Sequence, residues 1–168
     1  MVLTKSELIA SLQNEVRILL HLAGKIDRAW LDYRPAPKQR SILELLQYLS
    51  IMGPTLVQLA LAEQRDISLF QSASKTAAQR DFDQTLAAIA AQSDAYATLL
   101  ADVPDDHLRT EMQGFDGRAT SRGSFIVNLV LSGCAAYRTQ LFLYLKACGR
   151  EELTTSNLWA GADAPVAV

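Results

Sequence analysis

Hydrophobic residues recur at helical spacing in four separate stretches of the chain. The clearest stretch runs from Ser121 to Gly149, where successive residues of a helix would be rotated by about 100°. One apolar stripe there consists of Ile126, Val130, Gly133, Tyr137, Leu141 and Tyr144. A second apolar row, about a quarter turn away, contains Val127, Leu131, Cys134, Phe142 and Leu145. We therefore predict the last long helix of a bundle, covered by other elements on more than one side.

Two earlier stretches predict the first two helices. The first begins at Thr4 or Ser6, because Glu7 completes a capping box with Thr4. Its apolar face is expected to extend to Trp30, and His21 on the polar face is expected to point to water. A turn follows, because two prolines interrupt residues 31–40. Ser41 then caps the second helix, residues 42–63, with a kink expected near residues 50–53, just before Pro54.

The pattern predicts a third helix over residues 76–101, ended by Pro104. Residues 65–75 before it are expected to form a polar connection. Residues 105–122 contain two glycines and have no sustained period, which predicts a long loop that can hold a short hairpin and form the rim of a pocket. Residues 150–168 are expected to be a tail anchored only at Leu153, Leu158 and Trp159.

Four amphipathic helices joined by connections of this kind predict an all-α fold, a four-helix bundle. At 168 residues, 49% of them apolar, the chain is long enough for one domain with a continuous core. We expect a single domain over residues 1–168, with its core at about 4–149.

Charge and cysteine content narrow the functional classes. The formal net charge is −2, with basic and acidic residues intermingled, so we expect no nucleic-acid partner. Charged or polar residues interrupt each apolar run, so we expect no membrane partner either. Cys134 and Cys148 are too far apart for a disulfide within one straight helix. Reduced thiols and the lack of a signal-peptide pattern predict a cytoplasmic protein.

Three motifs give the chain a resemblance to a known family. Tyr33-Arg34-Pro35 followed by Ser41-Ile42-x-Glu44-Leu45-Leu46-x-Tyr48-Leu49 resembles the entry to helix 2 of the DinB-like (DNA-damage-inducible) four-helix bundle superfamily. Gly133-x-x-x-Tyr137-Arg138-x-Gln140-Leu141-x-x-Tyr144-Leu145-x-x-x-Gly149 is similar to the helix 4 pattern of that family. Leu153-Thr154-x-x-Asn157-Leu158-Trp159 is similar to its C-terminal segment.

The resemblance implies an up-down-down-up bundle with a long loop between helices 3 and 4. It also implies a tendency to form dimers and a cavity in which three histidines bind a divalent metal. Some members with that site are metal-dependent transferases or isomerases that use low-molecular-weight thiols. At the positions where the family would place its three histidines, this chain has Tyr48, Gly133 and Tyr137.

That replacement removes the donors that a metal needs. A catalytic zinc or nickel site takes about three imidazole, thiolate or carboxylate ligands. Glycine has no side chain, and a phenol with a pKa near 10 is a poor ligand at neutral pH. Neither a rescue site involving Cys134 or His107 nor acid-base catalysis by a tyrosine has the supporting residues that would favour it. We therefore predict no cofactor, and zinc or nickel only if the degenerate-site interpretation is wrong.

The space left at Gly133 has two possible outcomes. Either Tyr48 or Tyr137 fills it and closes the core, or an apolar pocket remains, with the two phenols and Gln140 as polar groups. Arg138 is expected in an ion pair at a helix or subunit contact.

We favour a non-catalytic protein that binds a small ligand in the bundle or acts as a structural or regulatory homodimer. The alternative is a metal- and thiol-dependent transferase or isomerase with an altered site. The predicted dimer face is the part of the second apolar row made of Val127, Leu131, Phe142 and Leu145.

Overall fold

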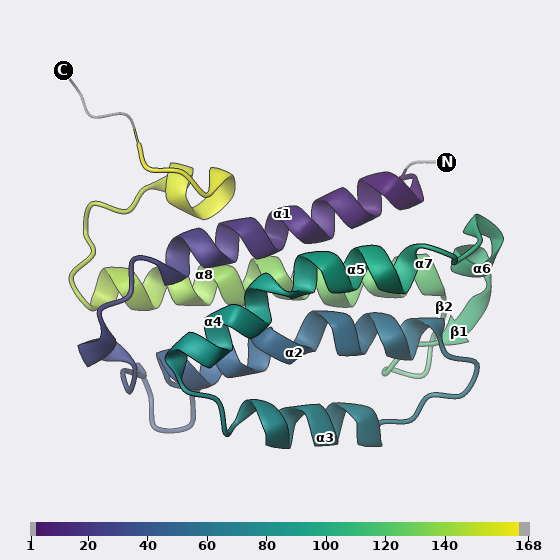
Figure 1. The fold of residues 1–168 in the computed structure, drawn as a ribbon, viewed down its shortest axis with the longest axis horizontal. Coiled ribbons are helices and arrows are strands. Elements are labelled where there is room, and N and C mark those ends of the chain that lie inside the picture. Colours follow the sequence, from purple (N-terminus) through teal and green to yellow (C-terminus); the bar gives the residue numbers. More distant parts are fainter. Residues whose placement is uncertain (1–2, 165–168) are drawn as a thin grey trace.

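Four long helical segments form the bundle in a computed structural model that describes residues 3–164 (Figure 1). They are α1 (Lys5–Ala23), α2 (Ile42–Leu61), α4 with α5 (Phe82–Ala90 and Gln92–Leu100), and a segment made of α7 (Arg122–Phe125), a π-helical stretch (Ile126–Leu131) and α8 (Ser132–Ala147). In Figure 1, α1 and α8 run in one direction and α2 and α4–α5 run in the other. This is the up-down-down-up arrangement expected from the resemblance.

The connection between the second and third long segments is itself helical. Because α2 and α4–α5 run in the same direction, the chain must return along the whole bundle between them. It does so through α3 (Ser68–Ala77), which lies alongside α2 (Figure 1). Our expectation of an irregular connection over residues 65–75 was therefore wrong. Its residues are mostly exposed and serine-rich, so they lack the wide apolar stripe that identifies a core helix.

The predicted start of the third long helix was also wrong, because that helix begins at Phe82 rather than Thr76. Asp81 caps it, and the side-chain oxygen of Gln84 accepts a hydrogen bond from the Asp81 backbone N–H. The same capping box, Thr4 with Glu7 and Ser41 with Glu44, starts α1 and α2, as predicted.

Short elements complete the described chain. A 3₁₀ turn (Arg28–Trp30) follows α1, and α6 (Asp105–Arg109) follows α5. Strands β1 (Glu111–Gln113) and β2 (Ala119–Ser121) form an antiparallel hairpin with Met112 opposite Thr120. The short hairpin considered from the sequence is therefore present. The last element is a π-helical turn over Ser156–Ala160.

This C-terminal turn packs on α1. Two expectations about α1, its end at Trp30 and the exposure of His21, were wrong. Helix α1 ends at Ala23 with Gly24 as its C-cap, so Trp30 belongs to the separate 3₁₀ turn. His21 does not point to water, because the Asn157 amide nitrogen lies 3.1 Å from its Nε2 and its side chain is only 17% exposed. Burial, together with the charge on Lys25, lowers the pKa of His21. The C-terminal segment up to residue 164 thus covers part of α1.

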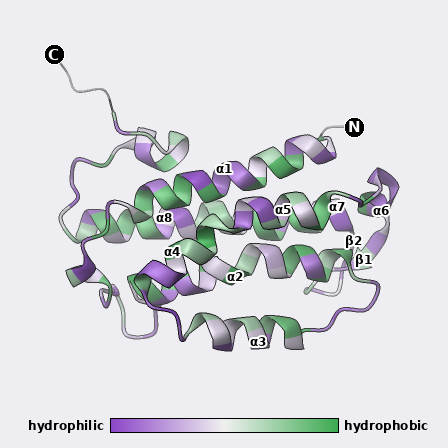
Figure 2. Ribbon diagram, viewed as in Figure 1, coloured by the Kyte–Doolittle hydropathy of each residue, from purple (hydrophilic) through white to green (hydrophobic). Residues whose placement is uncertain are grey.

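Helix α2 is at the centre of the bundle, and its buried positions occur on nearly every side. Figure 2 shows the amphipathic colouring of the helices around it. By length and composition alone, α2 and the Arg122–Ala147 segment could each span a membrane. Most of the apolar window in α2 is buried within the bundle, as in the core helix of a soluble protein, whereas most of the window in Arg122–Ala147 is not.

Gly53 allows α2 and α5 to approach closely. A Cβ atom at this position would overlap the Tyr96 hydroxyl and lie 2.9 Å from Tyr96 Cζ. Next to it, Pro54 cannot donate a backbone hydrogen bond, yet α2 continues through this position. Gln92 donates to the Leu49 carbonyl in the preceding turn and accepts from the Tyr96 hydroxyl. These contacts hold α5 against the weakened turn of α2.

We predict that Gly53→Ala lowers the free energy of unfolding by about 1–3 kcal/mol, because the added methyl group overpacks this contact. Chemical denaturation of the single variant and of Gly53→Ala with Tyr96→Phe measures the effect. Removal of the hydroxyl should restore part of the loss. Equal stability of Gly53→Ala and the wild type would contradict the proposed contact.

The π-helical stretch changes the twist of the last long helix locally. Its hydrogen bonds join residues five apart instead of four, so each residue turns through a smaller angle than in an α-helix. Beyond Leu131, Leu141 and Tyr144 of the predicted stripe are buried, whereas Gly133 and Tyr137 are only half-buried. Arg138 and Leu145, which lie outside that stripe, are buried as well.

Candidate functional site

A pocket lies between α2, α3 and the last long helix at the positions singled out from the sequence. Its volume is about 540 Å³, within the usual range for small-molecule sites. We call it the tyrosine pocket. It is lined by Tyr48, Met52, Leu56, Ile67, Phe70, Phe115, Asn128, Leu129, Ser132, Gly133, Ala136 and Tyr137.

The two tyrosines form one side of this pocket without filling it. Their ring centroids are 5.1 Å apart at an interplanar angle of 69°, an edge-to-face contact. Phe70 from α3 makes a second such contact with Tyr48, at 6.1 Å. A Cβ at Gly133 would meet only the flexible end of Met52, 3.3 Å away. Of the two outcomes considered from the sequence, a pocket remains.

Gln140 does not line this pocket. Its side chain donates to the Tyr144 hydroxyl and lines a separate surface pocket with Tyr33 and Leu143. The sequence analysis placed Gln140 one turn beyond Tyr137 on the same face, but the side chain is directed to Tyr144 instead. The structure thus brings together Tyr48, Gly133 and Tyr137 of the four predicted residues.

The tyrosine pocket is neutral inside and has an arginine beside it. Burial, and then the neighbouring Tyr137 phenol, raise the pKa of Tyr48 to about 12. Tyr48 therefore stays protonated at neutral pH and can donate a hydrogen bond. The guanidinium carbon of Arg40 lies 4.0 Å from the centroid of the Tyr48 ring and 5.9 Å from that of Tyr137. No lining residue is charged.

These residues do not fit a divalent metal. The positions that the DinB-like resemblance assigns to ligands offer two phenols and a glycine, which is not a zinc or nickel donor set. Across residues 3–164, no three His, Cys, Asp or Glu side chains come together in a way that could hold an ion. His21 contacts Asn157, and His107 Nε2 lies 3.1 Å from the Leu61 carbonyl at the end of α2. The histidines thus occupy two separate places in the bundle.

Cys134 faces away from the pocket, towards a buried ion pair. Arg138 Nη1 donates to Glu15 Oε2 of α1 at 2.7 Å, and the two side chains are 4% and 15% exposed. The sequence analysis predicted an ion pair at a helix or subunit contact for Arg138, and the pair with Glu15 is such a contact between helices. Burial, with Glu15 as a second cause, raises the pKa of Cys134 to about 12. The thiol is therefore protonated and unreactive at neutral pH.

We predict that Glu15→Leu is more destabilising than Arg138→Leu. Loss of Glu15 leaves a buried guanidinium that cannot lose its proton, at a cost of about 3–5 kcal/mol. Loss of Arg138 is milder, because burial already raises the pKa of Glu15 and the acid can become neutral. Urea unfolding of both variants and of the double variant measures the coupling. If the double variant loses the sum of the single losses, the pair is not coupled.

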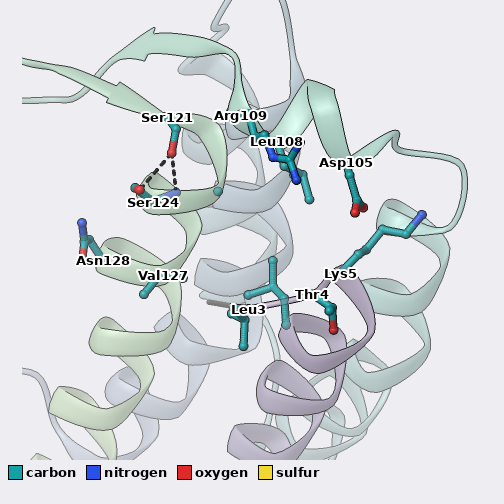
Figure 3. Close-up of a pocket in the computed structure, with 12 residues that line it drawn as sticks. Leu3, Thr4, Lys5, Asp105, Leu108, Arg109, Ser121, Ser124, Val127 and Asn128 are labelled. Atoms are coloured by element: carbon teal, nitrogen blue, oxygen red, sulfur yellow. Dashed lines mark hydrogen bonds between the residues drawn. The ribbon is translucent and has the colours of Figure 1, made fainter. Parts of the chain in front are cut away.

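A second pocket of about 540 Å³ lies at the end of the bundle where α1 begins. Figure 3 shows apolar Leu3, Leu108 and Val127 facing it, with polar residues around the rim. The Ser121 hydroxyl bonds to Ser124 there. Asp105, Arg109 and Ser121 confirm that the loop after α5 forms a pocket rim. Asn128, in the π-helical stretch, lines both this pocket and the tyrosine pocket.

Several residues of the tyrosine pocket were missed by sequence reasoning. Phe70 and Phe115 come from α3 and from the hairpin loop, and Asn128 comes from the π-helical stretch. Ile67 and Phe70 are apolar residues in a polar segment, which is a signal that the sequence contains. Arg40 gave no signal, since it lies in an irregular, proline-containing turn.

Comparison with known structures identifies the fold. No protein-family model and no curated protein sequence matches the chain. The structure is similar to the crystal structure of YjoA, a DinB-like protein from Bacillus subtilis, with a TM-score of 0.67. The match covers 88% of this chain and 95% of YjoA, at 16% sequence identity. The chain therefore has the DinB-like fold.

Proposed function

We propose that this protein is a member of the DinB-like family that binds a small molecule in the tyrosine pocket and is not an enzyme. The observation that carries the proposal is the pocket itself, a surface-open apolar space with two phenols where the resemblance expects metal ligands. Apolar walls with a few polar groups are typical of ligand sites. A metal- and thiol-dependent activity would require donors that Tyr48, Gly133 and Tyr137 do not supply.

The rigidity of the surroundings also supports ligand binding. Tyr48 is held by edge contacts to Phe70 and Tyr137, so a ligand would meet preformed aromatic walls. The half-exposed Ile67 and Phe115 form the outer part of the pocket. An apolar surface of this kind is stabilised when a ligand covers it.

We predict that the neutral probe N-phenyl-1-naphthylamine becomes fluorescent on binding the wild-type protein and that Gly133→Phe abolishes this signal. The new ring would occupy the pocket, with only the flexible end of Met52 in its way. Ser124→Phe, which alters the second pocket, is the matched control and should keep the signal. Circular dichroism verifies that both variants fold.

An unchanged signal in Gly133→Phe would show that the probe binds elsewhere and would contradict the proposed site. Metal analysis of protein purified without chelators tests the other half of the proposal. Stoichiometric zinc or nickel, retained after gel filtration, would favour the thiol-dependent transferase or isomerase instead.

The proposal includes a cytoplasmic homodimer formed through the last long helix. Its supporting observation is that the apolar window of Arg122–Ala147 is only 22% buried. Leu145 cannot belong to the interface, because it is fully buried in the core, which corrects the sequence-based face. Val127, Leu131 and Phe142 are half-buried and remain as candidates.

We predict that light scattering after gel filtration gives about twice the 18.4 kDa mass of the chain. Leu131→Glu should give a monomer, because a charge in a contact between copies is desolvated without a partner. Leu143→Glu, at a position that is 57% exposed, is the matched control and should stay dimeric. A monomeric wild type would rule out the dimer, and dissociation by Leu143→Glu alone would place the interface elsewhere.

A further inference from the structure

The tyrosine pocket has no charged lining residue but has two arginines close to it. Its lining is uncharged, but an arginine lies one aromatic ring away at each of two places. Arg40 lies over Tyr48 and Tyr137, as described above. Arg65 lies 5.6 Å from the centroid of the Phe115 ring, in a neighbouring pocket that shares Ile67 and Phe115 with this one. Two guanidinium groups therefore lie next to the apolar space, each against an aromatic ring that lines it.

Arg40 lines a neighbouring pocket that shares Tyr48 with the tyrosine pocket and also contains Glu44. Within the described residues its guanidinium takes part in no ion pair and no hydrogen bond, and the side chain is exposed. Glu44 is nearby and its pKa is lowered, first by the Ser41 backbone and to a smaller extent by Arg40. However, its carboxylate accepts from Arg34 at 3.2 Å and from the Ser41 backbone at 2.8 Å. The guanidinium of Arg40 thus lies over the Tyr48 ring without a hydrogen-bonded partner among the described residues, and a guanidinium can stack on a ring and bind an anion at once.

A cluster of aromatic rings can also bind a ligand cation. Here that alternative is disfavoured, because the guanidinium of Arg40 already occupies the face of Tyr48 at 4.0 Å and would repel a second positive charge. The remaining polar groups are the phenols of Tyr48 and Tyr137 and the side chains of Asn128 and Ser132. No acidic side chain lines the pocket.

We propose that the tyrosine pocket binds an amphipathic anion, a carboxylate on an apolar body, whose head group is held by Arg40 and the Tyr48 hydroxyl while its tail lies along Met52, Leu56 and Phe70. This inference rests on the proposed function and specifies the chemical class of its ligand. A carboxylate is the anion whose two oxygens match the guanidinium plane. The apolar walls bind the tail, and the cation beside the tyrosines selects the sign of the head group.

The test compares three ligands with the same alkyl tail by isothermal titration calorimetry at neutral pH. They are decanoate, decan-1-ol and decyltrimethylammonium, each below its micelle concentration. Decanoate should bind about tenfold more tightly than the alcohol and the cation. Arg40→Gln should weaken decanoate binding about fivefold and leave the alcohol unchanged. Arg65→Gln, the matched control with the same loss of charge, should change decanoate binding less than about twofold.

The outcomes separate this inference from the proposed function. Binding of the alcohol as tight as that of decanoate, or no effect of Arg40→Gln, would overturn the anion preference while leaving a ligand pocket in place. Tighter binding of the cation would do the same and favour the aromatic cluster as a cation site. If none of the three ligands binds and N-phenyl-1-naphthylamine also gives no signal, both proposals fail. Loss of decanoate binding in Gly133→Phe ties the result to this pocket.

Discussion

The parallel course of α2 and α4–α5 is the constraint on which the rest of the architecture depends. A chain that leaves α2 at one end of the bundle must return to the other end before the next long helix can begin. The returning segment becomes α3, and its Phe70 reaches the Tyr48 ring of α2. Without this return, Tyr48 would lack its cover on that side and the tyrosine pocket would lose a wall. The site is therefore a product of the connection as much as of the four long helices.

The central position of α2 explains why small residues are needed in it. Gly53 permits Tyr96 to reach the helix backbone, and the Gln92 amide then bonds to Leu49. At the other end of the helix, Arg122 donates to the Ala60 and Ala62 carbonyls and His107 lies beside the Leu61 carbonyl. Polar side chains thus complete the hydrogen bonding at the C-terminal end of α2. The same contacts join α6 and α7 to α2.

Much of this fold follows from local rules that act within a few residues. The capping boxes at Thr4 and Ser41 and the amphipathic stripes predicted the starts and the inward faces of α1 and α2. The helical nature of α3 was not predictable in this way, because only Ala77 of its residues is buried. The inward face of the last long helix was only partly predictable. Its stripe was identified, and Leu141 and Tyr144 are buried as expected, but Gln140 lies outside the pocket and Leu145 lies in the core. Nothing local indicates a π-helical stretch at Ile126–Leu131. In the pocket, Tyr48, Gly133 and Tyr137 were found by spacing and resemblance, whereas Phe115 and Arg40 come from loops whose approach depends on the whole fold.

The C-terminal turn has a consequence for how the chain tolerates cleavage. Ile18 of α1 is buried, and a side chain at Gly161 would press against it, so this turn supplies a layer of the interior rather than an appendage. The stretch before it, at Glu151 and Glu152, is exposed. A protease that cuts there would therefore separate a short peptide that still adheres through Asn157 and Asp163. Nicked molecules would migrate as intact ones in gel filtration, and their division would be visible only under denaturing conditions.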